Sequence, residues 1–309
     1  MVRSAAISCF LALGFIAATT RAAPEADLRA DLRAKFEARL KAINDNFEGV
    51  FGAAFIDLTD GHKVNFNADA VMPTASAIKV AVLAELLRQA DAKPGMLKKQ
   101  VAFVPSENTG TSGMARLIGP GSSLSLEDLA KMMINLSENT ATNLLIDEVG
   151  MDNVNQLTGG AGLKSIRLRR KMLDYDTQAA NQENVANAGD AALLMMKVAN
   201  CALPLSKGAC VTMRKILEIP KTPFPATDPI PKDIPIAFKP GSLEGVLSGW
   251  GIVGLPERPY AFAIMTTYGT TNATAVRDAS AAGFDYFWRL GRANQYGARV
   301  TMKKADHAK

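Results

Sequence analysis

The sequence predicts a mixed α/β fold of the α+β type, in which an antiparallel sheet carries the two terminal helices and an all-helical lobe lies beside it. Three observations support this prediction. Apolar residues recur with helical spacing near both ends of the chain, over 28–43 and 273–290. Short apolar or alternating stretches typical of strands follow the first of these helices and precede the last. Between them, from about Ser76 to Cys210, Leu, Ala and Met dominate in periodic stretches.

The first 22 residues have the pattern of a secretory signal peptide. Arg3 precedes an apolar run over 5–19, and Thr20-Arg21-Ala22 supplies the small residues of a cleavage site. The run is too short for a membrane-spanning helix. We expect cleavage after Ala22 and a secreted or periplasmic protein without a membrane span. An uncleaved membrane anchor is the alternative.

The charge of the chain argues against a nucleic-acid partner. Removing the signal peptide lowers the formal net charge of +5 by the two charges of Arg3 and Arg21. The segment 298–309, expected to be a solvated basic tail, holds four cations and one acid, so the body of the chain is close to neutral. A basic groove for nucleic acid is therefore not indicated.

Cysteine and histidine usage limits the chemistry further. The mature chain keeps Cys201 and Cys210, which in an oxidising compartment form either a disulfide or two buried thiols. His62 and His307 are the only histidines, which excludes a histidine-rich metal site. We expect no metal, no cofactor and a monomer.

The region 23–297 is predicted to form one domain, with a helical lobe over about 76–210. Strands are predicted over 50–58, 63–66, 236–239, 246–255 and 260–267. Helices inside the lobe are predicted over 76–90, 126–135, 140–149 and 188–199. A polar stretch over 167–187 and a proline-rich crossing over 220–235 are expected to lack core elements.

Ser76 and Lys79 form the first candidate catalytic pair. Residues three apart lie on one face of a helix, so the Ser76 hydroxyl and the Lys79 amine can meet. Thr74 is predicted to cap this helix, which places Ser76 in the first turn, where free backbone N–H groups favour a developing anion. A lysine activates a serine when burial lowers the lysine pKa. An ordinary helix start with a surface lysine is the alternative.

Ser137-Glu138-Asn139 lies between two predicted helices, a junction that can direct a hydroxyl and an amide into a cleft. A capping role for Ser137 is the alternative. The same three residue types recur over 106–108, where Pro105 and nearby glycines favour a surface turn.

Lys239-Pro240-Gly241-Ser242 follows a predicted strand. Lys239 can bind a substrate carboxylate by charge, and Gly241 lets a ligand approach the backbone closely. A strand-ending turn with a solvated lysine is the alternative. A similar segment over 93–95 is explained as the stop signal of the Ser76 helix.

Taken together and in this order, the three segments resemble the Ser-x-x-Lys, Ser-Asp-Asn and Lys-Thr-Gly motifs of the class A β-lactamases and penicillin-binding proteins. The segments 139–145 and 167–170 resemble the family as well, and the resemblance runs from about Phe47 to Leu290. It implies a β-lactamase/transpeptidase-like catalytic domain over 23–297. The substrate would be a small-molecule β-lactam or a cell-wall peptide-like compound.

The resemblance also implies roles for individual residues. Ser76 is the acylated nucleophile and Lys79 its base or proton relay. Ser137 passes the proton to the leaving nitrogen, Asn139 orients the substrate amide, and Lys239 supports Ser137 and the substrate carboxylate. The oxyanion lies between the backbone N–H groups of Ser76 and Ser242.

Three positions depart from the family pattern. Glu138 replaces an aspartate, and Pro240 replaces a threonine, which removes a hydroxyl and a backbone donor. Met172 stands where class A enzymes carry the glutamate that activates the deacylating water, and a thioether cannot take a proton. The carboxylates of the same loop that could replace this base are Asp174, Asp176 and Glu183. Solvated loop charges are the alternative.

We therefore predict a class A β-lactamase-like serine hydrolase that acts on β-lactam amides through a Ser76 acyl-enzyme. The alternatives are a D-alanyl carboxypeptidase or esterase of the same fold, and a penicilloyl-binding protein without turnover. A Ser-His-Asp hydrolase is not indicated, because His62 lies in a predicted hairpin turn and His307 in the tail.

Overall fold

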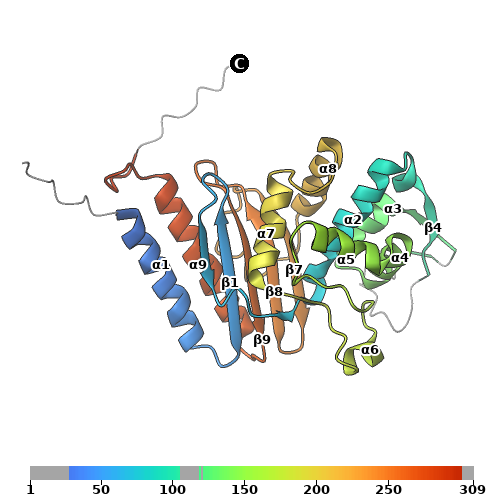
Figure 1. Ribbon diagram of the computed structural model, residues 1–309, viewed down its shortest axis with the longest axis horizontal. Helices are drawn as coiled ribbons and strands as arrows, with labels where there is room; N and C mark the ends of the chain where they lie inside the picture. The colour runs from blue at the N-terminus through green and yellow to red at the C-terminus, as the bar shows by residue number, and fades with distance from the viewer. Residues whose placement is uncertain (1–27, 105–117, 120, 301–309) are drawn as a thin grey trace, which may run out of the picture.

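The computed structural model describes residues 28–104, 118–119 and 121–300. They form a five-stranded antiparallel sheet with helices on both faces and a helical lobe beside it, so the fold class predicted from the sequence is confirmed (Figure 1). The predicted signal peptide, the second Ser-Glu-Asn segment at 106–108 and most of the predicted basic tail lie outside the described residues.

The sheet combines strands from both ends of the chain. β1 (Val50–Asp57) and β2 (Lys63–Phe66) form the predicted hairpin. β7 (Ile236–Leu243), β8 (Val246–Val253) and β9 (Tyr260–Thr267) form a meander. The order across the sheet is β2-β1-β9-β8-β7. Every residue of the central strand β9 is buried, as expected where both faces of a sheet are covered.

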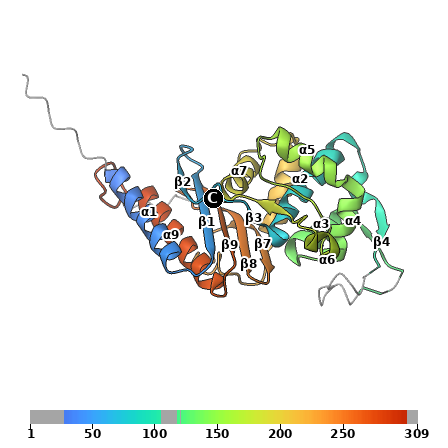
Figure 2. The same cartoon turned by 60° about the horizontal axis from the view of Figure 1, so that its bottom comes forward.

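The two terminal helices, α1 (Leu28–Asp45) and α9 (Asn272–Gly291), pack side by side on one face of the sheet (Figure 2). Phe36 of α1 stacks on Tyr286 of α9 with 4.9 Å between ring centroids, and it meets Phe55 of β1 edge-on at 5.1 Å. A Cβ on Gly283 would lie 2.4 Å from the Phe55 ring. Glycine therefore allows α9 to approach the sheet closely.

The opposite face of the sheet is covered by α7 (Ala188–Ala199). Ala54 and Ile56 of β1 belong to the core on the α7 side, whereas Ala53 and Phe55 belong to the core under the terminal helices. This alternation follows from the two-residue period of a strand.

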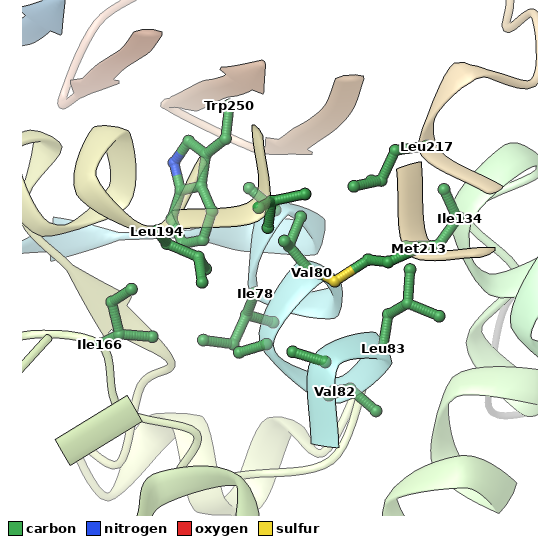
Figure 3. Close-up of a cluster of buried hydrophobic side chains, with 14 of the residues drawn as sticks. Ile78, Val80, Val82, Leu83, Ile134, Ile166, Leu194, Met213, Leu217 and Trp250 are labelled. Atoms are coloured by element: carbon green, nitrogen blue, oxygen red, sulfur yellow. The ribbon is translucent and has the colours of Figure 1, made fainter. Parts of the chain in front are cut away.

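α2 (Lys79–Ala92) lies at the centre of the helical lobe, and its residues from Lys79 to Leu87 are all buried. The longer helices around it are α3 (Leu126–Asn135), α4 (Asn139–Val149), α5 (Met151–Gly160) and α8 (Lys207–Glu218). Figure 3 shows Val80 and Leu83 packed with Met213 of α8, close to Trp250 of β8. This packing joins the lobe to the sheet.

Short elements complete the fold. They are η1 (Ala75–Ile78), η2 (Met96–Lys98), α6 (Tyr175–Ala179), β3 (Met72–Pro73) paired with β6 (Val185–Ala186), and β4 (Gln100–Ala102) paired with β5 (Ser123–Ser125). No helix within the described ranges is both long and apolar enough to span a membrane.

The start of the predicted helix at Ser76 differs from expectation in two respects. A 3₁₀ turn, η1, precedes α2, so Ser76 lies outside the α-helix. The expectation that Thr74 caps this helix is wrong, because its hydroxyl donates to the carbonyls of Ala75 and Asn184 instead. Thr74 thereby ties the turn to the polar stretch over 167–187.

Cys201 and Cys210 form a disulfide, which decides between the two interpretations of this pair. Their Cα atoms lie 5.5 Å apart, within the range that a disulfide needs. The bond connects the turn after α7 to the first half of α8. It therefore ties the helix that covers the sheet to a helix that packs against β7.

Replacing both cysteines with serine is expected to lower the free energy of unfolding by about 2–3 kcal/mol, because the bond restricts the unfolded chain. Urea unfolding followed by circular dichroism measures the change. As a control, the wild-type protein reduced with dithiothreitol should unfold at the same urea concentration as the double variant. An unchanged midpoint in the double variant would contradict the prediction.

Candidate active site

Ser76 lies in η1, where the helical lobe meets the edge strand β7. The preceding residue, Ala75, has a φ of +47°, in the left-handed region that alanine rarely adopts. Ala75 and Ala77 are both buried, whereas Ser76 between them is partly exposed. The strained turn thus presents one hydroxyl to the surface, as is common at functional sites.

The turn rests directly against β7 at Gly241. A Cβ at this position would lie 2.5 Å from the Thr74 carbonyl oxygen and 2.8 Å from the Ala77 nitrogen. From the sequence, this glycine is expected to let a ligand approach the backbone closely; in the structure the Ser76 turn makes such an approach. Gly241 is therefore required for the contact between this turn and the strand.

Lys79 is fully buried at the start of α2, and its amine lies among oxygen atoms of the junction between α3 and α4. Nζ donates to the Ser137 carbonyl at 2.8 Å, to Ser137 Oγ at 3.2 Å and to Asn139 Oδ1 at 2.9 Å. Burial lowers the pKa of Lys79 to about 7, although the charge of Glu138 acts in the opposite direction. The amine can therefore accept a proton near neutral pH.

Glu138, rather than Ser137, caps α4. Its carboxylate accepts a hydrogen bond from the Thr140 nitrogen at 2.9 Å, and its carbonyl accepts one from Thr142 Oγ1 at 2.6 Å. Ser137 itself adopts a φ of +54°. Because Glu138 supplies the cap, the Ser137 hydroxyl is available to accept hydrogen bonds from Lys79 and Lys239.

Lys239 is the second of these lysines, and it too is fully buried. Its Nζ donates to Ser137 Oγ at 3.0 Å and to the Pro240 carbonyl at 2.8 Å. Burial holds the pKa of Lys239 well below its usual value, and the positive charges of Lys79 and Lys221 lower it further. β7 continues to Leu243, so Lys239 does not lie in a strand-ending turn.

The outer side of β7 offers backbone donors to a ligand. Within the described residues β7 pairs only with β8, so no strand pairs with its other edge. Proline is tolerated in an edge strand when its nitrogen faces away from the neighbouring strand. The backbone N–H groups of residues two apart in a strand face the same edge. The N–H of Ser242 therefore faces the same edge as the nitrogen of Pro240, which is the edge without a partner strand.

Met172 lies directly against α4. Asn143 holds its backbone from both sides, since Oδ1 accepts from Met172 N at 2.8 Å and Nδ2 donates to Met172 O at 3.2 Å. Asn143 follows Asn139 by one helical turn, on the same face of α4. Position 172 is thus held about one helical turn of α4 away from Asn139, which binds Lys79.

The three loop carboxylates are engaged elsewhere or exposed. Asp174 caps α6 by accepting from the nitrogen and the hydroxyl of Thr177, which lowers its pKa. Glu183 pairs with Arg170 through both oxygens, at distances from 2.8 to 3.0 Å. Asp176 is exposed. No hydrogen bond among the described residues joins any of the three to Ser76, Lys79 or Ser137.

Lys221 is a further lysine whose charge acts on Lys239, and the sequence motifs do not include it. Its Nζ donates to the carbonyls of Leu217 and Ile219 at 2.7 and 2.8 Å, at the end of α8. Burial lowers the pKa of Lys221 to about 8. A lysine that directly follows the end of a helix can donate to the last carbonyls of that helix. The sequence did not predict α8, so this contact of Lys221 was not predicted either.

Comparison with known proteins identifies the family. The chain matches the model of the beta-lactamase enzyme family over residues 35–287. Beta-lactamase L2 of Stenotrophomonas maltophilia is 29% identical over 149 residues, which are 47% of this chain and 48% of the relative. A beta-lactamase of Streptomyces fradiae is 29% identical over 139 residues, 44% of this chain and 45% of the relative. These matches span just under half the length of each relative.

Solved structures extend the likeness over a larger share of this chain. A beta-lactamase from Sphaerobacter thermophilus superimposes with a TM-score of 0.73 at 27% identity, covering 82% of this chain and 97% of that chain. PBP-A superimposes with a TM-score of 0.75 at 24% identity over 83% of this chain and 97% of that chain, which is a likeness of fold. The resemblance found in the sequence is confirmed, and the chain belongs to the beta-lactamase enzyme family.

Proposed function

We propose that this protein is a class A β-lactamase-like serine hydrolase that opens β-lactam amides through an acyl-enzyme on Ser76. The observation that carries the proposal is the convergence of two buried amines, those of Lys79 and Lys239, on the Ser137 hydroxyl beside the Ser76 turn. We further propose that the protein acts outside the cytoplasm after removal of residues 1–22.

In the acylation step, neutral Lys79 takes the proton of the Ser76 hydroxyl while Oγ bonds to the β-lactam carbonyl carbon. The carbonyl oxygen gains negative charge and is bound by the N–H groups of Ser76 and Ser242. Each such donor is worth roughly 3–4 kcal/mol. When the carbon–nitrogen bond breaks, the Lys79 proton passes through Ser137 to the leaving nitrogen. Asn139 orients the substrate amide, and Lys239 attracts the carboxylate of the substrate.

Hydrolysis of the acyl-enzyme needs a base for the attacking water, and the side chain at 172 is a thioether. Asp174 and Glu183 have other partners, which disfavours them as substitutes. We therefore propose that acylation is faster than deacylation. The second candidate function, a penicilloyl-binding protein without turnover, is the limiting case of the same scheme.

Intact-mass spectrometry of the mature protein mixed with a penicillin tests the proposal. An adduct of the whole penicillin on Ser76 that decays with release of hydrolysed product is expected, and Ser76→Ala should form none. A lasting adduct would indicate the binding protein without turnover. No adduct, together with hydrolysis of an ester substrate, would contradict β-lactam specificity. An adduct that persists in Ser76→Ala would contradict the assignment of the nucleophile.

The rate of acylation is expected to depend on pH through Lys79. Its pKa of about 7 means that the amine is protonated below this pH and neutral above it. The acylation rate constant should therefore rise from about pH 6 to about pH 8 and then level off. Stopped-flow measurements with a chromogenic cephalosporin give this profile. A rate that stays constant over this range would contradict a proton-accepting role for Lys79.

Replacing Met172 with glutamate is expected to accelerate deacylation by about a hundredfold, because a positioned general base contributes about that much or more. Met172→Gln is the matched control, since it has the same shape without a base. Decay of the adduct mass measures deacylation in both variants. Equal decay in the two variants would show that position 172 cannot deliver a base to the acyl-enzyme.

A further inference from the structure

A basic and partly apolar surface lies at the end of the molecule where α1 begins and α9 ends. We call it the basic end and define it by its exposed or half-buried apolar and cationic residues, which are Leu28, Lys35, Trp288, Arg289, Arg292, Tyr296, Arg299 and Val300. Both views show the start of α1 and the segment after α9 side by side (Figures 1 and 2).

Trp288 is the centre of the basic end. The guanidinium carbon of Arg292 lies 4.8 Å from its ring centroid and that of Arg299 lies 4.5 Å from it. A hollow of about 320 Å³ beside the ring has an apolar floor that includes Leu28 and Leu32. Tryptophan, which has an apolar body and a polar N–H, is enriched where an apolar phase meets water.

The segment after α9 is folded back to form this surface. Val300 donates its N–H to the Arg292 carbonyl at 2.8 Å, and Ala293 and Arg299 form a β-bridge. Arg299 is thereby held over Trp288 instead of extending into solvent. The start of the predicted basic tail is therefore part of an ordered surface.

The charge of the basic end remains positive when its acids are counted. Asp31 pairs with Lys35, Asp285 with Arg39 and Arg289, and Glu257 lies 3.8 Å from Arg292. These three acids are outnumbered by five cations, which are the four of the basic end (Lys35, Arg289, Arg292 and Arg299) and Arg39.

We propose that the basic end binds the surface of a membrane that contains anionic phospholipids. The cations neutralise lipid headgroups, and Trp288, Leu28, Tyr296 and Val300 enter the interface between headgroups and acyl chains. The helical lobe and β7, which form the candidate active site, lie on the side of the molecule away from α1 and α9 (Figure 1). Binding would therefore leave the Ser76 turn open to substrate.

Vesicle co-sedimentation of the mature protein, residues 23–309, tests this proposal independently of catalysis. Vesicles of phosphatidylcholine with about one third phosphatidylglycerol should bind the protein at about 0.05 M salt and release it at about 0.5 M, because salt screens the attraction. Vesicles of phosphatidylcholine alone should bind little. Absence of binding at low salt, or equal binding to both vesicle types, would overturn the proposal.

Two charge variants separate the basic end from net charge. Replacing Arg289, Arg292 and Arg299 with glutamine should weaken binding to the anionic vesicles roughly a hundredfold, given the usual contribution of each basic residue near such a surface. The matched control replaces three exposed lysines of the helical lobe, Lys98, Lys207 and Lys215, with glutamine and should retain binding. Equal weakening in the two variants would overturn the proposal. Thermal unfolding checks that both are folded.

Tryptophan fluorescence localises the contact. The chain has two tryptophans, of which Trp250 is fully buried and Trp288 lies in the basic end. Anionic vesicles should shift the emission of Trp288 to shorter wavelength, and Trp288→Phe should abolish the shift. A shift that survives this substitution would place the contact elsewhere and overturn the proposal.

Discussion

The burial of two lysine amines around one hydroxyl is the constraint on which the rest of the site depends. Both Lys79 and Lys239 donate to Ser137 Oγ, and neither side chain is exposed. Two ammonium groups at this spacing in a dry environment repel each other and lack hydration, so protonation of both is unfavourable. The site therefore holds an amine ready to accept a proton. Glu138 limits this effect, because its buried charge favours the protonated form of Lys79.

Keeping the amines in place requires backbone conformations that are unfavourable in isolation. Ala75, which directly precedes Ser76, and Ser137 itself both have positive φ. Such residues cost of order 1–3 kcal/mol each and persist where surrounding structure determines them. Here the determining contacts are the packing of η1 on Gly241, the Glu138 cap of α4 and the fully buried start of α2.

Sequence patterns predicted the residues of this site better than their contacts. Strong periodicity located α3, α7 and β9 at their observed bounds, and motif order brought Ser76, Lys79, Ser137 and Lys239 into one hypothesis. α5 and α8 were not predicted, because polar residues and Gly159-Gly160 dilute the first, and Gly208 with β-branched neighbours weakens the start of the second. The bonding of Thr74 to Asn184 and the packing of Gly241 on η1 are long-range contacts, which no local pattern encodes.

In the loop over 167–187, the carboxylate of Glu183 makes structural contacts that prevent it from also acting as a base. Glu183 satisfies Arg170 and also accepts from Gln178 and from the Asn184 nitrogen, and Asn184 in turn holds Thr74 before the Ser76 turn. Withdrawing Glu183 to activate a water would leave the nearly buried Arg170 without its partner, which is strongly destabilising. Asp174 is similarly committed, and the hydrogen bonds that lower its pKa also make it a weaker base. The loop that supports the nucleophile thus uses Asp174 and Glu183 for structure, and the thioether of Met172 offers no proton acceptor in their place.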